Sequence, residues 1–163
     1  MLLTILIILA VIYVVVDLIK KEQCPKKARP ELLSQMQGRA ILITGCDSGF
    51  GHALASHCRT QLSMVVIACC HNKNGREGSD ALEQRDGCHV IRGFDVADPA
   101  SVERARTRVD AILEEEGLPG LYCVVNNAAV LVFGEAEWQT SAQIAMQMQV
   151  LLFYLYLSVL GID

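Results

Sequence analysis

Short apolar runs alternate along this chain with longer stretches in which apolar residues recur at helical spacing. The apolar runs are rich in β-branched residues and are bounded by turn residues, a pattern typical of buried strands. The stretches between them predict helices over residues 50–62, just after residue 80, and from residue 99 to a stop at Gly117. The predicted strands are AILIT at 40–44, MVVIACC at 64–70, HVIRGF at 89–94 and LYCVVN at 121–126.

Each of the two longer predicted helices has one apolar face. The later helix also carries clear end signals, because Asp98 is a natural N-cap, Pro99 suits the first helical position, and Gly117 ends the pattern. The apolar stripe of this helix consists of Val102, Ala105, Val109, Ile112 and Leu113, and that of the 50–62 helix consists of Phe50, Ala53, Leu54, Cys58 and Leu62.

Strands that alternate with helices, and that are apolar almost throughout, indicate a parallel sheet covered by helices on both faces. Right-handed crossovers then give an α/β fold, a partial Rossmann-type doubly wound sheet with strand order 3-2-1-4. We expect this region to span residues 38–150, followed by a divergent apolar tail at 151–163. In that order the fourth strand is an exposed apolar edge, which can recruit a second copy of the chain or another protein.

The N-terminal residues are apolar and are followed by a basic segment. Residues 1–16 carry no charge, and about 19 residues of helix reach roughly 28 Å, just enough to span the hydrocarbon core of a bilayer. We predict a transmembrane anchor at 1–19 and a basic, proline-containing linker at 20–37. A cleaved signal peptide would instead need positive charge before the apolar run and a small-residue cleavage site after it. The basic linker favours a cytosolic domain beside membrane lipid headgroups.

The charge and the cysteines narrow the class of protein. The formal net charge is −4, and the residues after position 30 carry 16 acidic against nine basic side chains. An acidic domain of this kind is a poor nucleic-acid binder. The seven cysteines are scattered, form no C-x-x-C pair and fall mostly in apolar runs, which suits a reducing cytosolic setting and predicts no metal site.

The turn after the first predicted strand is rich in glycine, as the segment ILITGCDSGFGHAL at 41–54 shows. A Cβ at Gly45 would obstruct the turn, Gly49 would let the backbone approach a ligand, and Gly51 would let the helix pack against the strand. The free N–H groups at the start of the helix would face an anion such as a pyrophosphate. On the glycines alone, a tight turn without a ligand stays an alternative.

Further segments match this turn in order and spacing. The turn reads T-G-x-x-x-G-x-G from Thr44, the fourth strand ends in N-N-A-A at 126–129, and Phe94-Asp95-Val96 follow the third strand. Together these resemble the short-chain dehydrogenase/reductase family. The segments ITGCDSGFG and GEAEW look most like its membrane-anchored retinol and hydroxysteroid dehydrogenases, which implies a retinoid or steroid substrate and a place on the endoplasmic reticulum membrane.

The resemblance implies NAD or NADP as cofactor and a role for each matched residue. Ala129 stands where the family usually has glycine, which adds a Cβ close to the cofactor. The implied cofactor residues are Gly45, Ser48, Gly49, Phe50 and Gly51 around the pyrophosphate, Asp95 and Val96 beside the adenine, and Asn126 and Ala128 along the cofactor and the central sheet.

The choice between NAD and NADP stays open. NAD enzymes often hold the ribose hydroxyls with an acidic residue at the end of the second strand, yet this strand runs into His71 and Asn72. Lys73 and Arg76 would suit the 2′-phosphate of NADP, and they also read as ordinary solvated loop charges.

The family's catalytic residues have no counterpart in this sequence. The resemblance implies a Tyr, a Lys four residues later and a Ser that fixes the substrate oxygen, but no lysine follows Lys73. We therefore assign no catalytic residue and expect the cofactor-binding half of a C-terminally truncated enzyme. The apolar tail after Val150 would be a short membrane segment, a buried or partner-binding helix, or the product of splicing or a gene-model error. The alternative function is a non-catalytic dinucleotide-binding or scaffold protein.

Overall fold

The computed structural model describes residues 30–74 and 77–159, and the architecture belongs to Gln35–Asp163, one of two compact units of the chain. The predicted anchor at 1–19 lies outside the described residues, as does most of the linker. The end of the linker forms a helix, α2 (Pro30–Met36). Among the helices within the described ranges, none is long and apolar enough to cross a bilayer.

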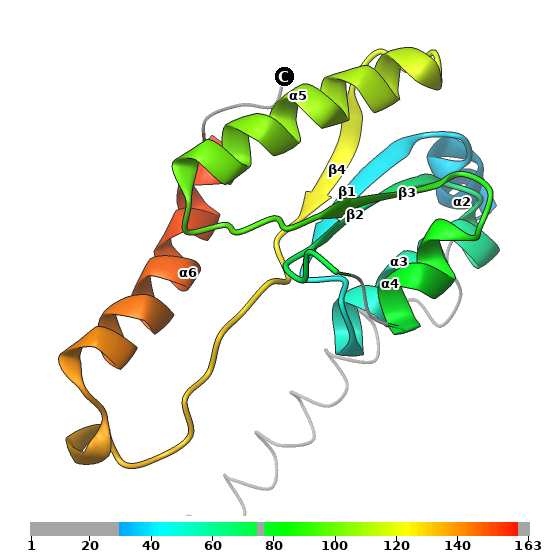
Figure 1. Cartoon of the computed structure of the whole chain (residues 1–163). Coiled ribbons are helices and arrows are strands. Elements are labelled where there is room, and N and C mark those ends of the chain that lie inside the picture. Colours follow the sequence, from blue (N-terminus) through cyan, green and yellow to red (C-terminus); the bar gives the residue numbers. More distant parts are fainter. Residues whose placement is uncertain (1–29, 75–76, 160–163) are drawn as a thin grey trace, which may run out of the picture. The chain divides into compact units, whose positions relative to one another are not determined.

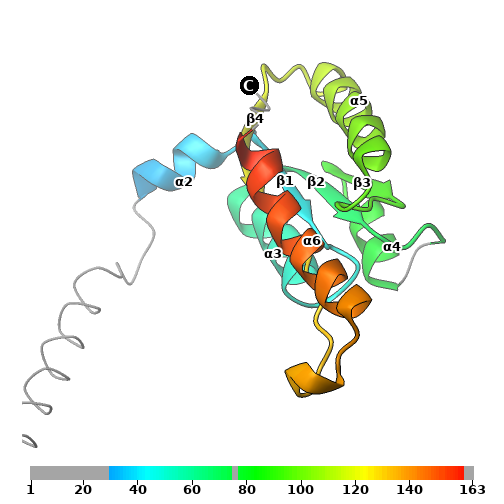
Figure 2. The ribbon, with the colours of Figure 1, turned by 90° about the vertical axis from the view of Figure 1, so that its left-hand side faces the viewer.

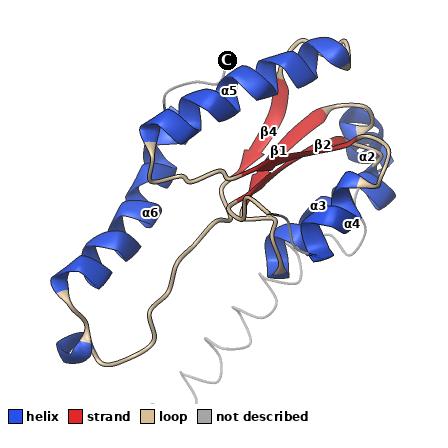
Figure 3. Cartoon of the chain, in the orientation of Figure 1, coloured by secondary structure: helices blue, strands red, loops and turns tan. Residues whose placement is uncertain are grey.

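Four parallel strands form one sheet in the order β3-β2-β1-β4, which confirms the predicted topology (Figures 1 and 3). The two inner strands are buried at every residue, because helices cover both of their faces. The outer strands are less buried, and β4 pairs with β1 along one edge. The strands are β1 (Ala40–Thr44), β2 (Val65–Cys70), β3 (Cys88–Arg92) and β4 (Leu121–Val125).

The helices form a layer on each side of the sheet (Figures 1 and 2). On one side, Ala55 and Cys58 of α3 and Leu82 of α4 pack with residues of β1 and β2. On the other side, α5 covers the sheet, and Val150 of α6 joins the same apolar cluster. The helices are α3 (Gly49–Leu62), α4 (Glu77–Glu83), α5 (Pro99–Glu115) and α6 (Ser141–Val159), with a short 3-10 turn, η1 (Ala136–Trp138).

The ends of α5 lie where the sequence predicts them. Asp98 caps the helix, since its Oδ1 accepts the N–H of Ala100 at 3.0 Å, and Pro99 is the first helical residue. At the other end, Leu118 N–H donates to the Leu113 carbonyl at 2.8 Å and closes the last turn. Four members of the predicted stripe are buried, namely Ala105, Val109, Ile112 and Leu113, while Val102 is partly buried.

The predicted apolar face of α3 is wrong at two positions. Phe50 is 90% exposed and Ala53 is also exposed, whereas the buried residues are Gly51, Ala55 and Cys58. The reason is close packing, because α3 approaches the sheet through its smallest side chains and turns Phe50 toward solvent. Helical spacing does not show how closely α3 packs on the sheet, and so it places Phe50 on the wrong face.

Two smaller boundaries also differ. The short helix α4 begins at Glu77, whereas the sequence predicts it just after residue 80, and β3 spans residues 88–92 where 89–94 is predicted. Helix α6 runs without a break from Ser141 to Val159, so the predicted apolar tail begins in the middle of a helix.

Candidate functional site

The chain turns sharply at the carboxyl end of β1. Gly45 follows the strand with a φ of +72°, a conformation that residues with a side chain rarely adopt. A Cβ on Gly45 would also lie only 2.7 Å from the Cα of Ala128, in the loop after β4. The turn and this loop therefore cross with no room for a side chain, which confirms the reason predicted for Gly45.

Thr44 and Asn127 hold these two loops together. The buried Thr44 Oγ1 accepts the N–H groups of Asn127 and Ala128, each at 3.0 Å. In return, Asn127 Nδ2 donates to the carbonyls of Thr44 at 2.9 Å and Gly45 at 3.2 Å. We call these four hydrogen bonds the Thr44–Asn127 latch. The latch fixes the loop after β4 over the end of the central strand.

The first turn of α3 begins at the same place. Ser48 is the N-cap residue, but its side chain makes no capping hydrogen bond. The N–H groups of this turn lie at the positive end of the helix dipole and are suited to an external anion. A Cβ on Gly51 would collide with Gly45 O and Asn127 Nδ2, so close helix packing requires glycine there. Nothing lies within 4 Å of the position that a Cβ on Gly49 would take.

Asp47 connects the glycine turn to the end of β2. Its Oδ2 accepts the N–H of His71 at 2.7 Å, and its Oδ1 accepts the N–H of Asn72 at 3.0 Å. These amides follow the last strand residue and would otherwise lack an acceptor from the sheet. The partly exposed carboxylate of Asp47 is thereby held beside the end of β2.

The segment after β3 is tied to the first turn of α5. Asp95 N–H donates to Ser101 Oγ at 2.9 Å, and Ala97 N–H donates to Asp95 Oδ1 at 2.9 Å. Val96 and Phe94 are buried in the cluster beneath α5. The polar and apolar residues of this segment alternate, so Asp95 stays partly exposed between two buried neighbours.

A cavity of about 420 Å³ lies at the carboxyl ends of the strands, where the glycine turn and the loops after β3 and β4 meet. This is the edge at which open α/β sheets bind their ligands. The other wall residues include Val130 and Val150. Six of the nine predicted cofactor residues line the cavity, namely Gly45, Ser48, Phe50, Asp95, Val96 and Ala128. Gly49, Gly51 and Asn126 are not among its wall residues.

The cavity wall also holds Ala129 and His71, which were noted in the sequence without a binding role. Asp47 and Asn127 complete this part of the wall, and neither of them was given a role of its own from the sequence. Asn127 was within reach of sequence reasoning, because side chains of neighbouring residues in an extended segment point in opposite directions and only one of two asparagines can face β1. The contact of Asp47 with His71 spans 24 residues and leaves no local signal.

The cysteines near the carboxyl edge of the sheet have unreactive thiols. Cys46, Cys69 and Cys70 are fully buried. Burial raises the pKa of all three thiols, that of Cys70 to about 12. A thiol with a raised pKa is protonated at neutral pH and is a poor nucleophile or metal ligand. These residues therefore serve the core.

The chain belongs to the short-chain dehydrogenase family, whose family model matches residues 39–159. The matched segment thus runs nine residues beyond Val150. This membership confirms the predicted family and the predicted cofactor class, NAD or NADP, and leaves the choice between the two open.

The curated relatives include retinol and estradiol dehydrogenases, the types that the sequence indicated, and also a hydroxybutyrate dehydrogenase. Retinol dehydrogenase 7 of Mus musculus is 37% identical over 113 residues, which are 66% of this chain and 32% of the relative. Estradiol 17-beta-dehydrogenase 2 of Rattus norvegicus is 39% identical over 98 residues, 58% of this chain and 24% of the relative. Mitochondrial D-beta-hydroxybutyrate dehydrogenase of Mus musculus is 36% identical over 103 residues, 62% of this chain and 29% of the relative. The chain thus matches about a third or less of these relatives' length.

Solved structures agree on the fold. The 3-ketoacyl-(acyl-carrier-protein) reductase from Brucella melitensis, complexed with NADH, superposes with a TM-score of 0.61 at 26% identity, over 75% of this chain and 47% of that chain. The NADPH-bound carbonyl reductase from chicken fatty liver superposes with a TM-score of 0.61 at 21% identity, over 70% of this chain and 46% of that chain. At that identity the second likeness supports the fold alone.

Proposed function

We propose that this chain is the cofactor-binding part of a membrane-attached oxidoreductase that interconverts lipophilic alcohols and ketones of the retinoid or steroid type. The observation that carries the proposal is the Thr44–Asn127 latch, which holds an uncapped helix start against the cavity at the carboxyl edge of the sheet. An open helix start beside such a cavity suits the pyrophosphate of a dinucleotide.

The residues present fit this cofactor. Gly49 leaves open space where any larger residue would place a side chain, and its φ of +61° suits glycine. In the proposal, the pyrophosphate lies against the turn, at Gly45, Ser48, Gly49, Phe50 and Gly51. The adenine lies beside Asp95 and Val96, and Asn126 and Ala128 lie along the cofactor and the central sheet.

The bound cofactor would supply hydride acceptor or donor chemistry, and the chain's own residues would position it. Hydride exchange with an alcohol carbon also needs a group that moves the hydroxyl proton. None of the four tyrosines has a lysine four residues later, so the sequence as printed holds no family acid–base pair. We propose that this chain binds the nucleotide and does not by itself turn over substrate.

A second candidate is a non-catalytic dinucleotide-binding or scaffold protein. It is favoured by the exposed apolar side chains Leu131, Phe133 and Trp138 in the segment between β4 and α6, which are 67%, 89% and 77% exposed. Exposed apolar residues gathered in one segment are typical of a contact with a partner, either a second copy or another protein.

The binding proposal is tested with Gly49→Val in the full chain, purified in a mild detergent and titrated with NADH and NADPH by calorimetry. The valine fills the open space beside the helix start, so binding should be lost. Gly117→Val is the matched control, because Gly117 has a similar φ of +66° and equally open surroundings but follows the C-terminal end of α5, whereas Gly49 is the first residue of α3. Unchanged affinity in folded Gly49→Val, or equal loss in both variants, would refute the assignment.

The catalytic proposal is tested by supplying the same preparation with NAD or NADP, all-trans-retinol and several hydroxysteroids. We expect no production of reduced cofactor above a heat-treated sample. Turnover that disappears in Gly49→Val would show that this chain contains acid–base chemistry of its own and would favour a complete enzyme over either candidate.

Membrane attachment is proposed from residues 1–19, of which the first 16 carry no charge, and from the basic residues that follow them, with the domain on the cytosolic side of the endoplasmic reticulum. Alkaline carbonate extraction of membranes from cells that express the chain is the direct measurement. The chain should stay in the pellet, and its release into the supernatant would remove membrane attachment from the proposal.

A further inference from the structure

The end of β2 bears no acidic residue of its own, yet a carboxylate stands beside it. Asp47 reaches this point from the glycine turn and accepts the N–H groups of His71 and Asn72. We infer that Asp47 makes the site select NAD over NADP. The inference rests on the proposed function, because it requires a dinucleotide in the cavity.

The carboxylate of Asp47 keeps acceptor capacity for a ligand. A carboxylate offers about four lone-pair sites, and the two backbone amides of His71 and Asn72 occupy one on each oxygen. An acceptor at the end of the second strand is what binds the ribose 2′-hydroxyl in NAD-dependent Rossmann proteins. The glycine turn therefore supplies the group that the strand lacks.

The surroundings of Asp47 disfavour an added phosphate. A second cavity, of about 650 Å³, shares three wall residues with the first, and these are Asp47, His71 and Asp95. Two of the three are acidic, so a 2′-phosphate at the boundary between the cavities would meet like charge. The 2′-hydroxyl of NAD carries no such charge.

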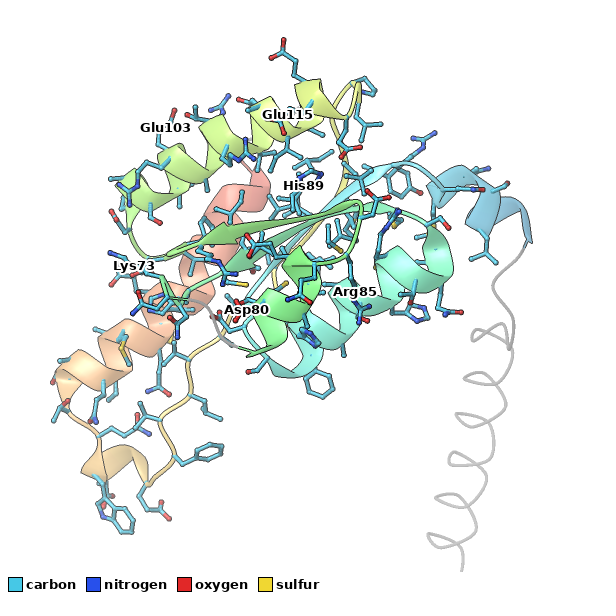
Figure 4. All side chains as sticks on the ribbon, turned by 45° about the vertical axis from the view of Figure 1, so that its right-hand side comes forward. Lys73, Asp80, Arg85, His89, Glu103 and Glu115 are labelled. Atoms are coloured by element: carbon cyan, nitrogen blue, oxygen red, sulfur yellow. The ribbon has the colours of Figure 1, made fainter. Side chains whose placement is uncertain are left out.

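Two basic side chains, Lys73 and Arg104, line the second cavity and would attract the 2′-phosphate of NADP. Lys73 lies near the carboxyl end of β3, with its aliphatic chain over Gly93, and its residue is exposed (Figure 4). Arg104 is 68% exposed and lies 3.5 Å from Asp98. Lys73 and Arg104 line the second cavity but not the first. Asp47 lines both cavities, and two hydrogen bonds hold its carboxylate in place. Exposed cations on long side chains gain little from a charge partner.

The test is a calorimetric titration of the full chain with NADH and NADPH, in the wild type and in Asp47→Asn. The wild type should prefer NADH, and the variant should narrow that preference by about tenfold or more, mainly by binding NADPH better. Glu103→Gln is the matched control, because it removes one negative charge from an exposed position on α5 (Figure 4). The control should keep the wild-type preference.

A second measurement covers the case in which Asp47→Asn does not fold. Added salt screens repulsion between like charges, so raising the ionic strength should narrow the preference of the wild type. Three outcomes would overturn the inference about Asp47 and leave the proposed function standing. These are equal affinities of the wild type for the two nucleotides, an unchanged preference in folded Asp47→Asn, and a preference that does not change with salt. Binding of neither nucleotide would overturn the proposed function as well.

Discussion

Replacement of Thr44 by valine removes the hydroxyl group at the centre of the latch and keeps the size of the side chain. The N–H groups of Asn127 and Ala128 then lose their acceptor, and a buried donor without a partner costs about 1–3 kcal/mol. Both residues are partly exposed, so the lower part of the range applies. We expect Thr44→Val to lower the free energy of unfolding by about 2–4 kcal/mol.

The assay is urea unfolding of the full chain in a mild detergent, followed by circular dichroism. Thr60→Val is the matched control, because the Thr60 hydroxyl donates to the Ser56 carbonyl at 2.8 Å on the exposed side of α3. This second change should alter stability by less than about 0.5 kcal/mol, as is usual for surface positions. Thr44→Val should also weaken nucleotide binding, since the loop after β4 loses two of the four hydrogen bonds of the latch.

The losses of stability in Thr44→Val and Thr60→Val, compared with each other, test whether the latch holds the two loops together. If Thr44→Val and Thr60→Val had the same small effect, the two hydrogen bonds that Thr44 Oγ1 accepts would not be what holds the two loops together. A large loss of stability with unchanged nucleotide affinity would separate the fold of this edge from its function. The latch would then be a structural feature alone.

Two further predictions concern the cavity and the core. Ala129→Gly removes a Cβ from the cavity wall and should tighten NADH binding, measured by calorimetry, by about threefold. An unchanged affinity would show that this Cβ does not contact the nucleotide. Burial raises the pKa of the thiols of Cys46, Cys69 and Cys70 above their ordinary value of 9.0, so the unfolded chain releases these protons first. These groups should therefore leave the free energy of unfolding unchanged below about pH 9 and lower it above that pH. Cys69→Ala should make this decline smaller. A urea midpoint that stays constant between about pH 8 and pH 10.5 would contradict the prediction.

The strand order and the position of the cavity could be predicted from the sequence because their signals are local. Each strand is a continuous apolar run, and the ends of α5 are marked by Asp98 and by the glycine after its last turn. The steric reason predicted for glycine at Gly45 and Gly51 is confirmed, since a Cβ at either would collide with the glycine turn or with the loop after β4. Such positions are dictated by the backbone.

The remaining site residues depend on contacts between distant segments. Asp47 could be assigned to the end of β2 only once His71 and Asn72 were placed beside the glycine turn. Likewise, the outward direction of Phe50 follows from how closely α3 packs on the sheet. Helical spacing shows which residues share a face, but the packing partner decides which face is buried.

The latch also bears on how the chain folds. It joins residues that are 83 and 84 positions apart, whereas β1 pairs with β2 at a separation of 25 residues. Distant contacts close late because more of the chain must first be ordered. We expect the loop after β4 to dock last during folding. A nucleotide that binds across this loop would then stabilise contacts that form only after the rate-limiting step of folding. Such a ligand would prolong the lifetime of the folded chain and leave its rate of folding almost unchanged.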